Sequence, residues 1–158
     1  MKSKISLSAY SIILTTLLTA VLAGLSAYTY GENLPAFILV LAVLVTLLVF
    51  SAIYAPRYLE VTDRRIVVHS LFKNHSILLS DVAGIETIAP TLGAIRIAAS
   101  GGYFGYWGIF REGDIGLYTG YYGKASRCIL VRLKNGDKYL LGTDDPTATA
   151  ACIASRLS

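Results

Sequence analysis

The sequence predicts a membrane-anchored α+β protein, in which two long apolar helices precede one β-rich domain that ends in a helix. Two observations lead to this fold class. Only 15% of the 158 residues are charged, against about 25% in ordinary soluble domains. The charges are also unevenly distributed: residues 1–56 hold three of them and residues 57–158 hold the other 21. We therefore expect a transmembrane hairpin over residues 1–56 and a water-soluble domain over residues 57–158.

Two uncharged stretches are long enough to cross a membrane. Residues 5–31 and 33–56 contain no charged side chain, and about 20 mostly apolar residues suffice for a transmembrane helix. We expect the two helices over about residues 8–29 and 35–55. The segment 30–35 between them contains Gly, Asn and Pro, which end one helix and begin the next, so the helices form a hairpin with a short connection.

Small side chains recur at every fourth position of the first predicted helix. They are Ser11, Thr15, Thr19 and Ala23. Such a stripe allows helix backbones to approach closely in lipid. It serves either to pack the hairpin on itself or to dock another membrane protein, and the sequence supports both interpretations.

The basic residues indicate on which side of the membrane the domain lies. Lys2 and Lys4 precede the first helix, Arg57 follows the second, and the connection between the helices has no basic residue. The positive-inside rule then places both ends of the chain in the cytoplasm, at a bacterial-type inner membrane crossed twice. The first segment also has the positive start of a signal peptide and a passable cleavage site at residues 21–23. Cleavage there would leave the domain on the same side.

Short runs rich in β-branched residues follow the second helix and predict about seven strands. They lie near residues 58–61, 66–69, 76–79, 84–88, 94–98, 127–133 and 138–141. Asn135-Gly136, between the last two runs, is a strong signal for a tight β-hairpin.

The final segment has apolar residues at helical spacing instead. It begins with Asp144-Asp145-Pro146, an N-cap acid before a proline at the first helical position. A single amphipathic helix therefore ends the domain, and its apolar face must cover part of the sheet.

Several of these segments resemble the bacterial pleckstrin-homology (PH-like) domains. The resemblance rests on residues 61–66, residues 77–85, the Gly-aromatic run 102–108 and the closing helix after Asp144-Asp145-Pro146. In the subfamily that these motifs resemble, the domains often follow membrane helices. The resemblance implies a split β-barrel, capped by the C-terminal helix, over residues 58–157. It implies less about function, because PH-like barrels bind lipids, peptides or nothing known.

The segment 101–123 is the most unusual part of the sequence. It holds eight of the 14 glycines and eight of the 17 aromatic residues, and its glycines fit neither common phosphate-loop pattern. One interpretation is a bulged, twisted pair of strands whose glycines make room for aromatic rings. The other is an aromatic-lined groove for a peptide or an acyl chain, or a second contact with the bilayer. The residues of this groove are Tyr103, Phe104, Tyr106, Trp107 and Phe110.

Basic residues close to the second helix predict contact with lipid headgroups. They are Arg57, Arg64, Arg65 and Lys73. Almost no linker separates the helix from the first strand, so the domain must lie against the inner leaflet. Each basic side chain near an anionic surface contributes about 1 kcal/mol of binding free energy. The same residues also satisfy the positive-inside rule without any specific binding, and both interpretations are kept.

No residue pattern indicates catalysis or a metal site. Cys128 and Cys152 are too few for a metal site, and His69 and His75 are six residues apart without an acidic cluster. Common hydrolase, metalloprotease and kinase motifs are absent from the sequence. The domain carries 12 basic and 9 acidic residues, too small and too mixed a charge balance for nucleic-acid binding.

We therefore expect a non-enzymatic binding or scaffolding module without cofactor or metal. Its expected partners are the lipid bilayer, an anionic phospholipid or a membrane protein. The alternative is a subunit of a larger integral-membrane complex, or a homo-oligomer, assembled through the transmembrane helices.

Overall fold

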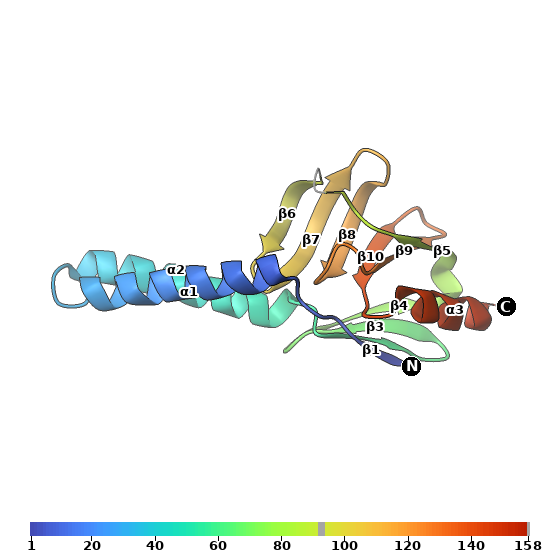
Figure 1. The fold of residues 1–158 in the computed structure, drawn as a ribbon, viewed down its shortest axis with the longest axis horizontal. Helices are drawn as coiled ribbons and strands as arrows, with labels where there is room; N and C mark the ends of the chain where they lie inside the picture. Colours follow the sequence, from blue (N-terminus) through green and yellow to red (C-terminus); the bar gives the residue numbers. More distant parts are fainter. Residues whose placement is uncertain (92–93, 158) are drawn as a thin grey trace.

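The computed structural model describes residues 1–91 and 94–157 and consists of a helical hairpin that projects from a β-rich domain (Figure 1). The hairpin contains α1 (Ala9–Thr29) and α2 (Leu34–Tyr54). Both helices begin and end within one residue of the expected positions. The two ends of the chain lie on the domain side of the molecule, opposite the tip of the hairpin.

The hairpin helices begin where their sequences provide a capping side chain. The Ser8 hydroxyl accepts a hydrogen bond from the Ser11 amide at 3.1 Å, and the Asn33 side chain accepts one from the Ala36 amide, also at 3.1 Å. Both helices are long and apolar enough to cross a membrane, and almost none of either apolar stretch is buried inside the protein. A core helix of a soluble protein would be largely buried, so this exposed apolar surface favours lipid as its surroundings.

The β-rich domain contains two sheets. The first has the strand order β1-β2-β3-β4 and is antiparallel throughout. Its strands are β1 (Lys2–Lys4), β2 (Tyr58–Val61), β3 (Arg65–His69) and β4 (Asn74–Leu78). A short 3₁₀ helix, η1 (Leu79–Asp81), leads to the second sheet.

The second sheet has the strand order β5-β9-β10-β8-β7-β6. Strands β10 and β8 pair in parallel, and the other neighbours are antiparallel. Its strands are β5 (Val82–Ile88), β6 (Ile95–Gly102), β7 (Gly105–Glu112), β8 (Gly116–Tyr122), β9 (Cys128–Leu133) and β10 (Lys138–Gly142). The C-terminal helix α3 (Pro146–Leu157) packs against β5 and η1 and covers the domain.

The described residues form ten strands, where the sequence predicts about seven. Strands β7 and β8 lie in the Gly-aromatic segment and correspond to the strand-pair interpretation of it. Gly108 in β7 has a φ of +116°, and a Cβ there would overlap the carbonyl oxygen of Ala98 on the neighbouring strand. The pairing register of β6 and β7 shifts next to this contact, between Arg96 and Ala98. The glycine thus permits the expected bulge.

Strand β1 is the element that the sequence does not predict, because Lys-Ser-Lys has no apolar alternation. It pairs with β2, so that Ser3 lies opposite Leu59. Ile5, which follows β1, is only 4% exposed and belongs to the core of the domain. The expected boundary after residue 56 assigns this segment to the hairpin, whereas in the structure it is part of the β-rich domain. The chain begins in the β-rich domain, leaves it through the hairpin and returns to it at β2.

Two apolar clusters fill the domain. The aliphatic cluster joins both sheets and includes Ile5 from the N-terminal segment and Ile153 from α3. The aromatic cluster belongs to the six-stranded sheet. Its buried members are Phe110, Ile115, Tyr118, Tyr122, Cys128, Leu130 and Leu140. Because Ile153 is fully buried, α3 acts as the predicted capping helix.

Candidate functional site

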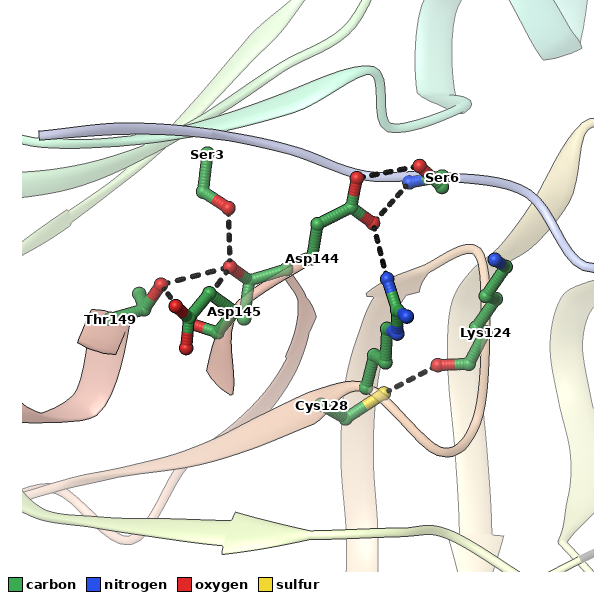
Figure 2. A network of polar contacts seen from close by, with 9 residues as sticks. Ser3, Ser6, Lys124, Cys128, Asp144, Asp145 and Thr149 are labelled. Atoms are coloured by element: carbon green, nitrogen blue, oxygen red, sulfur yellow. Dashed lines mark hydrogen bonds and ion pairs between the residues drawn. The ribbon is translucent and has the colours of Figure 1, made fainter. Parts of the chain in front are cut away.

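The N-terminal segment is fastened to the loop between β10 and α3 (Figure 2). The Asp144 carboxylate accepts hydrogen bonds from the Ser6 amide at 3.2 Å and from the Ser6 hydroxyl at 2.6 Å. The Asp144 amide donates to the Lys4 carbonyl at 2.9 Å, and the Thr143 hydroxyl donates to Ser3 Oγ at 2.7 Å. These contacts fix the segment that leads from β1 into α1.

The two acids that the sequence places at the start of α3 have different roles. Asp145 caps the helix, because its Oδ1 accepts a hydrogen bond from the Ala148 amide at 3.0 Å. Asp144 points toward Ser6 instead (Figure 2). Its Oδ1 lies 3.7 Å from the Arg127 guanidinium. Partial burial of Asp144 opposes its ionisation. The Ser6 hydrogen bonds and the charge of Arg127 outweigh this effect and lower the pKa of the carboxyl below its ordinary value.

A cavity of about 800 Å³ lies at the junction between the hairpin and the domain, and we call it the junction pocket. The N-terminal segment, both helices and two turns of the domain line it. Its large apolar side chains are Ile5, Leu7, Ile12, Leu48, Leu71 and Phe104. Its charged residues are Lys4 and Arg57, both exposed. Within residues 1–91 and 94–157, the side chains of these two cations have no hydrogen bond or ion pair. Apolar walls with two available cations suit an anionic amphiphile.

Two of the four predicted headgroup contacts lie at the hairpin side of the domain. The Arg57 amide, three residues after the end of α2, donates to the His69 carbonyl at 2.8 Å. The Lys73 ammonium lies 5.4 Å from the ring centroid of Tyr54, the last residue of α2. Arg57 and Lys73 are therefore close to the depth at which the second helix ends.

The other two, Arg64 and Arg65, lie at the opposite end of the first sheet. Strand β3 begins at Arg65 and runs back toward the hairpin, where it ends at His69. The turn that carries both arginines is beside α3, since the Arg156 guanidinium is 3.5 Å from Asp63 in the same turn. The structure thus does not bring the four basic residues together. Consecutive turns of an antiparallel sheet lie at opposite ends, and closeness in sequence to α2 does not reveal this.

Two of the aromatic residues predicted to form a groove, Tyr103 and Trp107, pack against the hairpin. The buried Tyr103 hydroxyl lies 2.9 Å from Thr19 Oγ1 on α1. The Trp107 ring stacks on Tyr54 of α2, with ring centroids 5.6 Å apart. Strands β6 and β7 therefore hold the hairpin through the same Gly-aromatic segment.

The remaining predicted groove residues lie at two separate cavities. Phe104 lines the junction pocket. Tyr106 and Phe110 line a second cavity of about 710 Å³, together with the cations Arg96 and Lys124. The Tyr106 ring also stacks on Tyr122, with centroids 4.9 Å apart, and Phe110 is almost fully buried. The five aromatic residues do not share one groove.

The small-residue stripe of α1 faces the protein's own domain over most of its length. Thr15 Oγ1 accepts a hydrogen bond from the Phe104 amide at 2.9 Å, Thr19 contacts Tyr103, and Ser11 is fully buried. Ala23 is exposed. A four-residue repeat turns by about 40° per step around a helix of 3.6 residues per turn, so the stripe rotates away from the domain. The stripe thus packs on the protein's own domain, which is neither of the two interpretations that its sequence supports.

The histidines and the buried cysteine have packing partners. His69 Nε2 lies 3.0 Å from Glu60, and its ring stacks on Tyr58. Burial and the charge of nearby Lys73 lower the pKa of His75, whose ring contacts Tyr121. The Cys128 thiol donates to the Lys124 carbonyl at 3.2 Å, and burial raises its pKa. In the part of the chain that the structure describes, no group of three or more His, Cys, Asp or Glu residues is placed to hold a metal ion.

The site residues that sequence reasoning missed are those of the N-terminal segment. The sequence predicts only a role in membrane topology for Lys4, whereas in the structure Lys4 lines the junction pocket. Ser6 and Asp144 meet across 138 residues of sequence. No local pattern marks these positions, because the contacts depend on the pairing of β1 with a strand that follows both helices.

The β-rich part of the chain matches a known family. Residues 57–156 match the family described as Bacterial PH domain. No curated protein and no solved structure matches the chain. The match extends from the end of α2 almost to the end of α3 and agrees with a β-rich fold capped by a C-terminal helix. The chain therefore belongs to the Bacterial PH domain family, and it carries two candidate membrane-spanning helices before the domain.

Proposed function

We propose that this protein is a non-enzymatic, membrane-anchored module that binds an anionic lipid of the cytoplasmic leaflet in the junction pocket. The observation that carries the proposal is the pairing of Lys4 and Arg57 with an apolar cavity at the base of the hairpin. A lipid phosphate would give both cations a charged partner. The acyl chain would pack against Leu48, Leu71 and Phe104 on the pocket walls.

The position of the pocket supports a lipid over a soluble anion. Each helix has 21 residues and is thus about 31 Å long, close to the thickness of the hydrocarbon core. The residues at the domain end of the hairpin therefore lie near the headgroups. The pocket contains Ile12 of α1 and Ser51 of α2, both close to that end. A lipid of the adjacent leaflet reaches the pocket without leaving the bilayer.

The cytoplasmic orientation is part of the proposal. Strand β1 precedes the hairpin and pairs with β2, which follows it, so both ends of the hairpin are on one side. Lys2, Lys4 and Arg57 are on that side, and the short loop at the other end has no basic residue. The positive-inside rule then favours the cytoplasm for the domain.

Assembly into a larger membrane complex has less support. Of the four stripe residues on α1, only Ala23 is exposed, while Thr15 and Thr19 bond the protein's own β6–β7 turn. Lipid binding in the junction pocket is accordingly the function that the geometry supports best.

The test is lipid selectivity of the full chain in bilayers, measured by electron spin resonance with spin-labelled phosphatidylglycerol and phosphatidylcholine. We expect a preference for phosphatidylglycerol that weakens as salt is added. In the Lys4→Gln/Arg57→Gln variant the preference should fall several-fold, since each cation contributes about 1 kcal/mol.

The matched control is the Arg64→Gln/Arg65→Gln variant, which removes the same charge at the opposite end of the sheet. Its lipid preference should stay close to that of the unmodified protein. Equal losses in the two variants would contradict binding in the junction pocket.

A further inference from the structure

Outside the hairpin and its connection (residues 9–54), the most exposed large apolar side chains are concentrated in two places. In the described part of the chain outside residues 9–54, five such side chains are more than half exposed: Leu71, Phe72, Ile95, Ile97 and Leu117. The first two lie in the turn between β3 and β4, and the next two lie in the first residues of β6. We call these four residues the interfacial patch. The patch thus consists of two separate pairs; single exposed apolar residues are common, whereas neighbouring ones mark an interaction surface.

The β3–β4 turn is attached to the end of α2. The Phe72 amide donates to the Ala52 carbonyl at 3.3 Å, and Ala52 is two residues before the last residue of α2. Lys73, the next residue, has its ammonium over the Tyr54 ring. The Phe72 side chain is nevertheless 77% exposed. It is thus held beside the end of the helix, at the level where hydrocarbon meets headgroups, and its ring has no stacking partner among the described residues.

Strand β6 is also next to the hairpin, where it contacts α1. It is the strand of the six-stranded sheet nearest the hairpin in Figure 1, and it is an edge strand. Its end at Gly102 packs on α1, where Tyr10 and Leu14 occupy the space that a side chain would need. At its other end Ile95, Arg96 and Ile97 are all exposed.

An exposed edge strand can pair with a strand of another molecule unless it is protected. Natural edges are usually short, charged or covered by another element. Strand β6 has eight residues and carries a single charge, on Arg96. In the described residues it has a partner strand on one edge only.

We infer that the interfacial patch inserts into the headgroup region of the bilayer, so that the domain lies on the membrane instead of hanging from the hairpin. The β3–β4 turn is hydrogen-bonded to the end of α2, and β6 packs on α1 through its Gly102 end, so both elements are attached to the hairpin. In Figure 1 these two elements flank the hairpin on opposite sides. Lys73 and Arg96 lie next to the apolar side chains, and a basic group beside an inserted apolar one suits anionic headgroups.

This inference rests on the membrane location in the proposed function but not on lipid binding in the junction pocket, with which the patch shares Leu71. Insertion of apolar side chains requires no anionic lipid. Insertion also fixes the angle between the domain and the membrane plane, because the domain then contacts the membrane on two sides of the hairpin.

The test uses bimane labels on single cysteines of the full chain in vesicles of phosphatidylcholine alone. The parent variant is Cys152→Ala, which retains the buried Cys128. Labels are placed by Phe72→Cys and Ile97→Cys. The controls are Leu78→Cys and Leu157→Cys, at exposed apolar positions in the last residue of β4 and the last residue of α3. Doxyl-labelled phosphatidylcholine quenches from the lipid, and iodide quenches from water.

Labels at positions 72 and 97 should be quenched several-fold more by doxyl lipid than the two control labels, and less by iodide. Equal iodide quenching at all four positions would overturn the inference. A bound protein partner at the patch would protect the labels from both quenchers, which would also overturn it. These vesicles contain no anionic lipid, so the quenching experiment does not depend on lipid binding in the junction pocket. If the pocket binds no anionic lipid, only the spin-resonance result will differ from the expected one. If the interfacial patch does not insert, only the quenching result will differ.

Discussion

The two apolar clusters of the domain are built in different ways. The aliphatic cluster joins the N-terminal segment, both sheets and α3. The aromatic cluster lies within one sheet, and two buried polar atoms, Tyr118 Oη and the neighbouring Glu112 Oε2, lack a hydrogen bond of good geometry among the described residues. A buried polar atom without such a bond costs free energy. The aliphatic cluster therefore connects the separate parts of the molecule. In the aromatic cluster, the free energy gained by burying apolar surface is partly offset by the cost of the two buried polar atoms.

The largest expected effect is on the aliphatic cluster, through Ile5→Ala. Ile5 is 4% exposed and connects the N-terminal segment to the rest of the core. Removing a buried side chain of this size should lower the free energy of unfolding by about 2–5 kcal/mol. The measurement is urea unfolding of the full chain in detergent. The control is Ile13→Ala on the exposed face of α1, and an equal loss in both variants would show that Ile5 is not a core residue.

A smaller effect is expected at Asp144, which fastens the same segment. Its pKa is lowered in the folded protein, so its carboxylate stabilises the fold above the ordinary pKa of 3.8, and this contribution is lost as the pH falls through the folded value. Asp144→Asn should cost about 1 kcal/mol at neutral pH, because part of the carboxylate is exposed to water. The difference from the unmodified protein should vanish in acid. Unfolding midpoints at several pH values test this, with Asp114→Asn at an exposed turn as the control.

The smallest effect, with the opposite sign, is expected in the aromatic cluster. Burial raises the pKa of Tyr118 to about 12, so its hydroxyl is neutral throughout the accessible pH range. Tyr118→Phe removes the hydroxyl and keeps the ring that stacks on Phe110. Stability should be unchanged or higher by up to about 1 kcal/mol. A clear loss of stability would mean that the hydroxyl has an effective partner, and the contrast between the clusters would fail.

Most of the fold could be predicted from the sequence because its signals are local. Uninterrupted apolar stretches predict both helices, and period-two alternation predicts most strands between residues 58 and 141. Asn135-Gly136 lies in the predicted hairpin turn, where Gly136 has a φ of +95°. The match to the Bacterial PH domain family confirms the resemblance noted in the sequence.

The candidate site was harder to predict because it depends on which distant segments meet. Arg64 and Arg65 are close to α2 in sequence, yet one strand length carries them to the far end of the sheet. Lys4 reaches the junction pocket only because β1 pairs with β2. The pattern of charges along the sequence predicts neither of these two positions.

The pairing of β1 with β2 also has a consequence for biosynthesis. Strand β1 is made before both helices, and its partner is made after them. If the chain inserts as proposed, β1 must wait unpaired on the cytoplasmic side while the whole hairpin enters the membrane. The first sheet can be completed only when the second helix has returned the chain to that side. Closure of this sheet thus distinguishes correctly inserted chains from those with one helix left out, and the latter would expose the edge of β2 to quality-control proteases.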